Sequence, residues 1–337
     1  MQAPSVPSLG LLVRLFTASN GHVDHTDPSQ PSDQPRWLQT VVAHEHFEAS
    51  LDLAAEIGAT GIEIVQAGQL SGAEYLLAQP SARAELQAAL AQRGLEIAAL
   101  NCSGMPLHPV RGPHYQEVIR QTIRLAQLLG VTTIVSMSGA GGDGPESTAV
   151  NWVFFPWPEE SVALLERQWE QAIALWQDLA GFARDHGVER IGLELHPMNL
   201  VYNVPTLLRL REAVGPIIGA TLDPSHLQWQ QMDPIAVVHA LGPAVHHVHL
   251  KDTQLIPDQM ATAGVLDQRP FSDPGRRAWI QRAIGRGHDA TFWSDFVDAL
   301  AASGYQGSVS IENEDPVLSH EDGVREAAAL LRPMLGA

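Results

Sequence analysis

Short apolar runs rich in β-branched residues alternate with longer segments of helical periodicity along most of the chain. The eight strand-like runs span residues 9–16, 60–65, 95–101, 131–137, 190–195, 218–223, 245–250 and 308–312. The helical patterns span residues 46–57, 81–93, 114–129, 161–186, 204–214, 233–241, 291–303 and 320–335. Strands that alternate with helices pair in parallel through crossover connections. Eight such units predict an α/β fold, the closed (β/α)₈ or TIM barrel.

The length of the chain also fits one barrel. A chain of 337 residues could hold two domains of ordinary size, but α/β barrels commonly exceed about 250 residues as one domain. We therefore expect residues 1–337 to form a single domain, with about residues 1–8 as a flexible N-terminus. The polar, proline-containing stretch 19–35 is expected to be a loop after the first strand.

The net charge of the chain limits the molecules it can bind, and its cysteine content limits the compartments in which it can work. The formal net charge is −18, from 38 acidic and 20 basic residues, so nucleic acids and anionic membranes would be repelled. We expect a small, neutral molecule as the partner. Cys102 is the single cysteine, which excludes an internal disulfide and is compatible with a reducing compartment. Because no leader pattern and no run of 18 apolar residues occurs, we expect a cytoplasmic protein.

Four residues with metal-binding side chains end four successive strand-like runs in the second half of the chain. They are Glu194, Asp223, His249 and Glu312. In a barrel, the carboxyl ends of neighbouring strands meet at one pocket, so these side chains should converge. Each one alone is also compatible with a helix N-cap or a salt bridge, but three inward carboxylates would repel one another without a cation. The sequence therefore predicts a divalent metal site, and its oxygen-rich shell favours Mn²⁺ or Mg²⁺.

The alternation of side chains along the strands agrees with this placement, because inward residues recur at every second position. If Glu312 faces the barrel axis, Ser310 does so too, whereas Val309 faces the helices. If His249 faces the axis, His247 lies one layer deeper. We interpret His247 as a hydrogen-bonded core histidine.

Five longer motifs extend the pattern to the whole second half of the chain. They are E-L-H-P-M-N-L-V-Y-N (194–203), L-D-P-S-H (222–226), H-V-H-L-K-D (247–252), G-R-G-H-D (285–289) and S-I-E-N-E-D (310–315). Through these motifs the chain resembles the xylose isomerase-like TIM barrels. This family includes sugar isomerases, ketose 3-epimerases, inosose dehydratases, 3-keto-glycoside C-deglycosidases and relatives of endonuclease IV.

The resemblance implies a ligand set and catalytic roles. It makes Glu194, Asp223, His249 and Glu312 the ligands of one divalent ion, first Mn²⁺, with Mg²⁺ or Co²⁺ as alternatives. It also implies that Glu194 and Glu312 form the acid/base pair on opposite faces of a sugar carbon, and that His226 contacts substrate oxygens near the carbonyl. A metal-bound carbonyl favours loss of the neighbouring proton through an enediolate. The predicted function is that of a metal-dependent sugar isomerase or epimerase.

Further residues near the predicted barrel mouth are candidate substrate contacts. They are Asn101, His108, His196, Lys251, Trp157 and His288. Lys251 could instead form a salt bridge with a rim carboxylate, and His196 could orient Glu194. Roles within their own loops are the alternative for Asn101, His108 and His288.

Trp157 belongs to an aromatic run, residues 152–158, that follows the fourth strand. By the rules of the fold, this run lies on the catalytic side of the barrel. A ring there could cover an apolar face of a sugar or an aglycone. The alternatives are a lid that packs on neighbouring loops and a contact between subunits.

Three other functions are compatible with the fold. A lyase acting on 3-keto glycosides would use the same proton abstraction to expel an aglycone, and some relatives work with a small partner subunit. An abasic-site endonuclease would need three zinc ions and ligands from early strands, where this chain has Val65-Gln66 and Asn101-Cys102. A sugar-binding barrel without catalysis is the third. A homo-oligomer or a small partner subunit both stay open.

Overall fold

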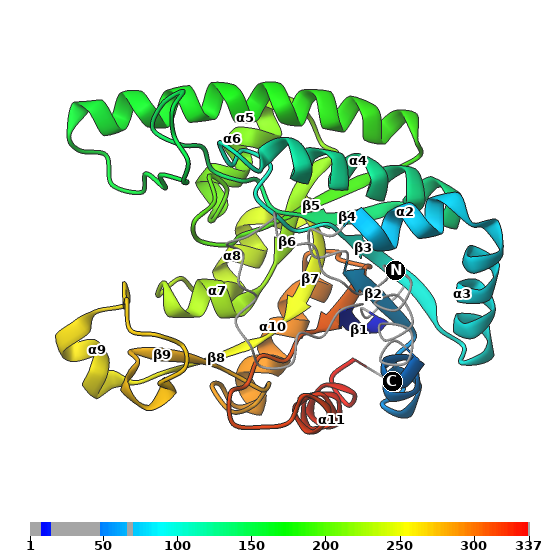
Figure 1. Ribbon diagram of the computed structural model, residues 1–337. Coiled ribbons are helices and arrows are strands. Elements are labelled where there is room, and N and C mark those ends of the chain that lie inside the picture. The colour runs from blue at the N-terminus through cyan, green and yellow to red at the C-terminus, as the bar shows by residue number, and fades with distance from the viewer. Residues whose placement is uncertain (1–7, 15–47, 66–69, 336–337) are drawn as a thin grey trace, which may run out of the picture.

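Eight parallel strands form a closed barrel in a computed structural model that describes residues 8–14, 48–65 and 70–335 (Figure 1). The strands are β1 (Ser8–Arg14), β2 (Gly61–Val65), β3 (Glu96–Asn101), β4 (Thr133–Ser136), β5 (Arg190–Glu194), β6 (Ile218–Leu222), β7 (Val245–Leu250) and β10 (Ser308–Ile311). They follow one another around the barrel in the order β1-β10-β7-β6-β5-β4-β3-β2. The predicted (β/α)₈ fold is confirmed, and β1 pairs with both β2 and β10 to close it.

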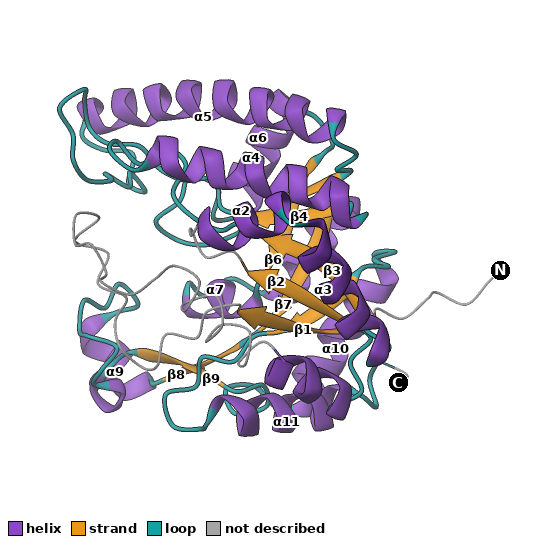
Figure 2. Cartoon of the chain, turned by 45° about the vertical axis from the view of Figure 1, so that its right-hand side comes forward, coloured by secondary structure: helices purple, strands orange, loops and turns teal. Residues whose placement is uncertain are grey.

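Helices surround this barrel on its outer face (Figures 1 and 2). They are α3 (Pro80–Gln92), α4 (Gly112–Leu129), α5 (Glu159–Asp185), α6 (Val204–Val214), α8 (Pro234–Leu241), α10 (Ala290–Ala302) and α11 (His320–Leu331), and residues 48–56 are also helical. Helix α11 ends earlier than its pattern predicts, because Pro333 has no amide proton to continue it. Within the described ranges, no helix is long and apolar enough to cross a membrane.

Several short elements were not predicted from the sequence. They are α2 (Leu70–Ala78), α7 (Pro224–Trp229), α9 (Pro257–Ala263) and the antiparallel pair β8 (Asp252–Leu255) and β9 (Trp279–Arg282). Strands β8 and β9 form a separate two-stranded sheet outside the barrel, next to α7 (Figure 2). These elements are too short for a helical or alternating period to be visible in the sequence.

The predicted N-terminal flexibility and the predicted loop 19–35 fall almost entirely outside the described residues. Ser8 is the exception, because it begins β1 and pairs with Ser308 of β10.

The outer faces of the strands form the apolar core with the helices. Val309 and Ile311 of β10 are buried in this core, whereas Ser310 between them points inward and lies 3.1 Å from His247 Nε2. The predicted alternation on this strand is therefore confirmed. The interior is tightly filled, since a Cβ atom on Gly192 would lie 2.3 Å from Oγ1 of Thr221.

Cys102, directly after β3, provides a chemical test of this packing. Burial raises the pKa of its thiol to about 12, although hydrogen bonds with Ser136 and Thr122 act in the opposite direction. At about pH 8 we expect iodoacetamide to label the folded protein at least about 100-fold more slowly than the urea-unfolded protein, because only the thiolate reacts. Mass spectrometry of the alkylated chain measures both rates. Equal rates would contradict a closed core at this position.

Candidate metal centre

Four side chains from four neighbouring strand ends converge at one end of the barrel. The ligand atoms of Glu194, Asp223, His249 and Glu312 all lie within 4.8 Å of one another, and all four residues are buried. Glu194 ends β5, His249 belongs to β7, and Asp223 and Glu312 directly follow β6 and β10. The amide of Glu312 donates to the carbonyl of Leu250 at 3.0 Å, which extends the ladder to the ligand position. The structure thus brings together the residues expected to bind metal.

Asp223 is both an N-cap and a member of this cluster. Its Oδ1 accepts a hydrogen bond from the amide of Ser225 at 2.9 Å at the start of α7. Its Oδ2 lies 3.0 Å from Lys251 Nζ and 3.3 Å from His226 Nε2. The cap fixes the side-chain rotamer, so that one oxygen is held toward the cluster while the other stabilises the helix.

The two ring nitrogens of His249 face different groups. Nε2 lies 3.0 Å and 3.1 Å from the carboxylate oxygens of Glu63, which can only accept, so Nε2 carries the proton. Nδ1 lies 3.6 Å from Glu194 Oε1 and 3.7 Å from Glu312 Oε2 and makes no hydrogen bond, although it is buried. Burial alone would lower the pKa of His249, but Glu63 and Glu194 raise it well above its usual value, so the site favours a positive charge at Nδ1, either a proton or a bound cation. The donor set and this unsatisfied nitrogen therefore fit a divalent metal ion.

Glu63 is the residue of this region that sequence reasoning missed. It is fully buried in β2 and also accepts hydrogen bonds from His247 Nε2 and Asn101 Nδ2, both at 2.7 Å. Burial alone would raise the pKa of Glu63, but His249 and His247 hold it well below its usual range. The sequence feature that could have identified Glu63 is that it is the single acidic residue, at an inward position, in the apolar run G-I-E-I-V. His247 is hydrogen-bonded in the core, as interpreted from the sequence.

Glu63, His247 and His249 also form a second cluster that has the spacing of metal ligands. The Nε2 atoms of both histidines and the two oxygens of Glu63 are already paired with one another, with Asn101 and with Ser310. We therefore interpret this cluster as the support of the first one.

Lys251 supplies positive charge to the cluster. Its Nζ lies 3.0 Å from Asp223 Oδ2, 3.0 Å from Glu312 Oε2 and 3.4 Å from Glu314 Oε2, and the residue is only 2% exposed. Burial alone would lower the pKa of Lys251, but the surrounding carboxylates raise it well above its usual value. Of the two roles considered for Lys251, the salt bridge is the one that the structure displays. Lys251 is also the only lysine in the sequence, since the other residues of the 20 lysines and arginines are all arginine.

His226 and His196 lie beside Glu194. The Nε2 atom of His226 is 3.4 Å from Glu194 Oε1, and the two imidazole rings are 4.1 Å apart. Burial and the neighbouring His226 lower the pKa of His196 to about 4, so its ring is neutral. Burial alone would raise the pKa of Glu194, but contacts with His226 and His249 hold it well below its usual range. Glu194 is therefore ionised.

The other predicted substrate contacts are engaged elsewhere. Asn101 bonds Glu63 and the amide of Ser103. His108 Nδ1 accepts hydrogen bonds from two amides of its own loop, and His288 Nδ1 lies 2.8 Å from Asp252 Oδ1. Trp157 is 72% exposed and does not line the pocket beside the cluster.

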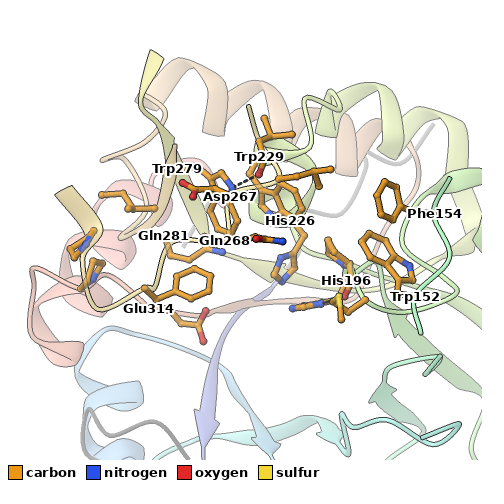
Figure 3. A pocket seen from close by; sticks show the side chains of 18 residues that line it. Trp152, Phe154, His196, His226, Trp229, Asp267, Gln268, Trp279, Gln281 and Glu314 are labelled. Atoms are coloured by element: carbon orange, nitrogen blue, oxygen red, sulfur yellow. Dashed lines mark hydrogen bonds between the residues drawn. The ribbon is translucent and has the colours of Figure 1, made fainter. Parts of the chain in front are cut away.

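This pocket has a volume of about 790 Å³, and His226 and His196 line its inner side (Figure 3). Lys251, Asn101, His108 and His288 are not among the described residues that line it.

Fold and site together define a TIM barrel with a carboxylate–histidine cluster at the carboxyl ends of its strands. The sequence profile of the family "Xylose isomerase-like TIM barrel" matches residues 51–334, and the chain belongs to this family.

The chain is 39% identical over 304 residues to the uncharacterized protein YfiH of Bacillus subtilis (strain 168), covering 88% of this chain and 97% of that protein. Two solved structures share the fold. L-ribulose 3-epimerase superimposes with a TM-score of 0.62 at 16% identity, over 98% of this chain and 95% of the other. The IOLI protein with a binding zinc atom superimposes with a TM-score of 0.60 at 18% identity, over 86% and 92% of the two chains.

The role of Glu63 can be tested with Glu63→Gln. Glutamine offers only one accepting oxygen for the two histidines, so His249 loses its fixed orientation. We expect Mn²⁺ affinity, measured by isothermal titration calorimetry, to fall by about 10- to 100-fold. The exposed Glu85→Gln variant is the matched control and should bind like the parent. Unchanged affinity in Glu63→Gln would contradict the supporting role.

Lys251 can be tested with Lys251→Met. This variant removes the ammonium and leaves buried carboxylates without their partner, so in EDTA we expect a loss of about 3–5 kcal/mol of stability. Saturating Mn²⁺ should recover a large part of that loss, and Lys251→Arg should be less affected in EDTA. Urea unfolding with and without Mn²⁺ measures both effects. A loss of stability that Mn²⁺ does not reduce would show that the ion does not bind between these carboxylates.

Proposed function

We propose that this protein is a divalent-metal-dependent sugar isomerase or epimerase. The observation that carries the proposal is the convergence of Glu194, Asp223, His249 and Glu312, with an unsatisfied nitrogen of His249 aimed at the carboxylates. Membership of the xylose isomerase-like family and the shared fold with L-ribulose 3-epimerase support it. We propose Mn²⁺ as the ion, with Mg²⁺ or Co²⁺ as alternatives, because three of the four ligands offer oxygen.

The chain's own residues divide the work of proton transfer. A divalent ion held by the four ligands would polarise a substrate carbonyl and acidify the neighbouring C–H bond. Glu194 is ionised and would accept that proton, whereas Glu312 in its protonated form would donate a different proton to the opposite face of the same carbon. Proton exchange of both glutamates with solvent then restores their starting states. General acid–base catalysis of this kind contributes about 10²- to 10⁴-fold.

His226 connects this chemistry with the pocket. Its Nε2 lies within 3.4 Å of Glu194 and Asp223 and makes no hydrogen bond, and its ring lines the cavity. It is thus placed to contact a substrate oxygen beside the two carboxylates. The net charge of −18 supports a neutral small molecule as substrate. It argues against a nucleic acid or an anionic membrane as partner, because both would be repelled.

A lyase that acts on 3-keto glycosides would share the proton abstraction and differ only in the bond that breaks afterwards. The products separate the two reactions. An epimerase exchanges the configuration of a free ketose, whereas the lyase releases a free aglycone.

The experiment uses free ketoses in D₂O with the Mn²⁺-loaded protein and measures deuterium incorporation by mass spectrometry. We expect Glu312→Gln to keep the parent's circular dichroism but to lose at least about 100-fold in exchange rate. The exposed Glu321→Gln variant on α11 serves as control. If the parent exchanges no ketose, the proposal fails; if Glu312→Gln exchanges at the parent rate, another group moves the proton.

A further inference from the structure

We propose that the pocket beside the candidate metal centre is a subsite for an uncharged aromatic or similarly flat apolar group of the substrate. This inference rests on the proposed function, because it takes the reacting sugar to lie at His226. It adds the chemical class of substrate: a neutral sugar that carries an apolar ring.

One wall of the pocket is a layer of stacked aromatic rings. Trp229 at the end of α7 and Trp279 of β9 are stacked with ring centroids 4.8 Å apart and an interplanar angle of 6°. Phe271 meets Trp279 edge-on at 5.7 Å, and Trp279 Nε1 donates to the carbonyl of Val265 at 2.9 Å. This wall therefore presents flat apolar faces that are fixed in orientation.

A buried arginine braces the wall from behind. The Arg277 guanidinium lies 3.9 Å from the ring centroid of Phe271 and 4.7 Å from that of Trp279, and the residue is only 1% exposed. Asp267 holds the same segment by accepting hydrogen bonds from the amide of Ala278 at 2.6 Å and from Arg269 at 2.8 Å. Because these contacts order the wall before a ligand arrives, binding costs little conformational entropy.

The opposite wall comes from the loop after β4. Trp152 and Phe154 lie across the pocket from Trp229 and Trp279, and His226 lies between the two sides (Figure 3). Trp152 is held edge-on against Tyr202 at 5.3 Å, and its ring contacts that of Phe154 at 5.1 Å. Phe154 is 50% exposed, which leaves apolar surface available inside the mouth.

The charge and size of the pocket define the occupant further. The described lining residues include Asp267 and Glu314 but neither lysine nor arginine, so a phosphate group would be unfavourable. A volume of about 790 Å³ falls in the upper part of the range for drug-sized ligands, well above the lower end of about 300 Å³. The amides of Gln268 and Gln281 can bond hydroxyl groups. Because the pocket is continuous with His226, its occupant belongs to the molecule that reacts there.

The test compares matched pairs of glycosides by isothermal titration calorimetry on the full-length, Mn²⁺-loaded protein. The probes are the phenyl and methyl β-D-glucopyranosides, β-D-galactopyranosides and β-D-xylopyranosides. Burial of a phenyl ring should make the phenyl member of at least one pair bind about 10-fold more tightly or better.

Two variants and one matched control locate the ring. Phe154→Ala and Phe271→Ala should each lower the phenyl-over-methyl preference by about 3- to 10-fold and leave methyl glycoside binding unchanged. Phe155→Ala should keep the preference, since Phe155 is 60% exposed and does not line the pocket. All three side chains are largely exposed, so the fold should tolerate their truncation.

Three results would overturn the subsite. The first is the absence of a phenyl preference in every pair of glycosides, and the second is a loss of preference in Phe155→Ala equal to that in the two variants. The third is a parent protein that shows no phenyl preference but sediments as a dimer, when Phe154→Ala and Phe271→Ala disrupt that dimer and Phe155→Ala does not. The last result would assign this face to a second copy of the chain. Deuterium exchange separates the two proposals: phenyl preference in a protein that exchanges no ketose would leave the subsite standing and remove the proposed function.

Discussion

The electrostatic balance inside the barrel is the constraint on which the rest of the structure depends. Four carboxyl groups, those of Glu63, Glu194, Asp223 and Glu312, are buried inside the barrel, and each has an oxygen within 4.8 Å of a ring nitrogen of His249. Such charges cannot leave water without cationic or hydrogen-bonding partners. The partners of these carboxyl groups lie on β7 and directly after it. There His247, His249 and Lys251 occupy every second position and point into the barrel. A single strand therefore supplies partners to acids from β2, β5, β6 and β10, and only a closed barrel brings those strands around it.

This balance is divided into two layers with different properties. In the deeper layer, Glu63 is fully paired by His247, His249 and Asn101, so the layer is rigid and complete by itself. In the upper layer, the ammonium of Lys251 is paired with Asp223 and Glu312, but Nδ1 of His249 makes no hydrogen bond. Lysine differs from arginine in being a compact point charge on a flexible stem, which can move aside when another cation enters. The only lysine of the chain thus lies where the proposed metal ion would have to take over its positive charge.

The sequence predicted the barrel and the ligand cluster because both come from local patterns combined with one rule of topology. Glu194, Asp223, His249 and Glu312 each end a recognisable strand, and parallel strands have their carboxyl ends on the same side. Glu63 was missed because its meaning depends on His247, 184 positions away, and no local pattern marks that contact. The aromatic wall was missed for a similar reason: Trp229 and Trp279 stack across 50 positions, on elements of six and four residues.

Helix α7 connects the candidate metal centre with the aromatic wall of the outer pocket. Asp223 caps this six-residue helix, His226 lies on its first turn, and Trp229 is its last residue. Because positions three apart lie on the same face of a helix, one short rigid body carries a metal-ligand candidate, a substrate-contact candidate and the aromatic wall. A ring that stacks on this pre-ordered wall would lie at a fixed distance from His226 and from the cap at Asp223. The fit of an apolar group in the outer pocket would therefore set the distance between the reacting carbon and the two glutamates, so binding energy gained far from the chemistry can position it.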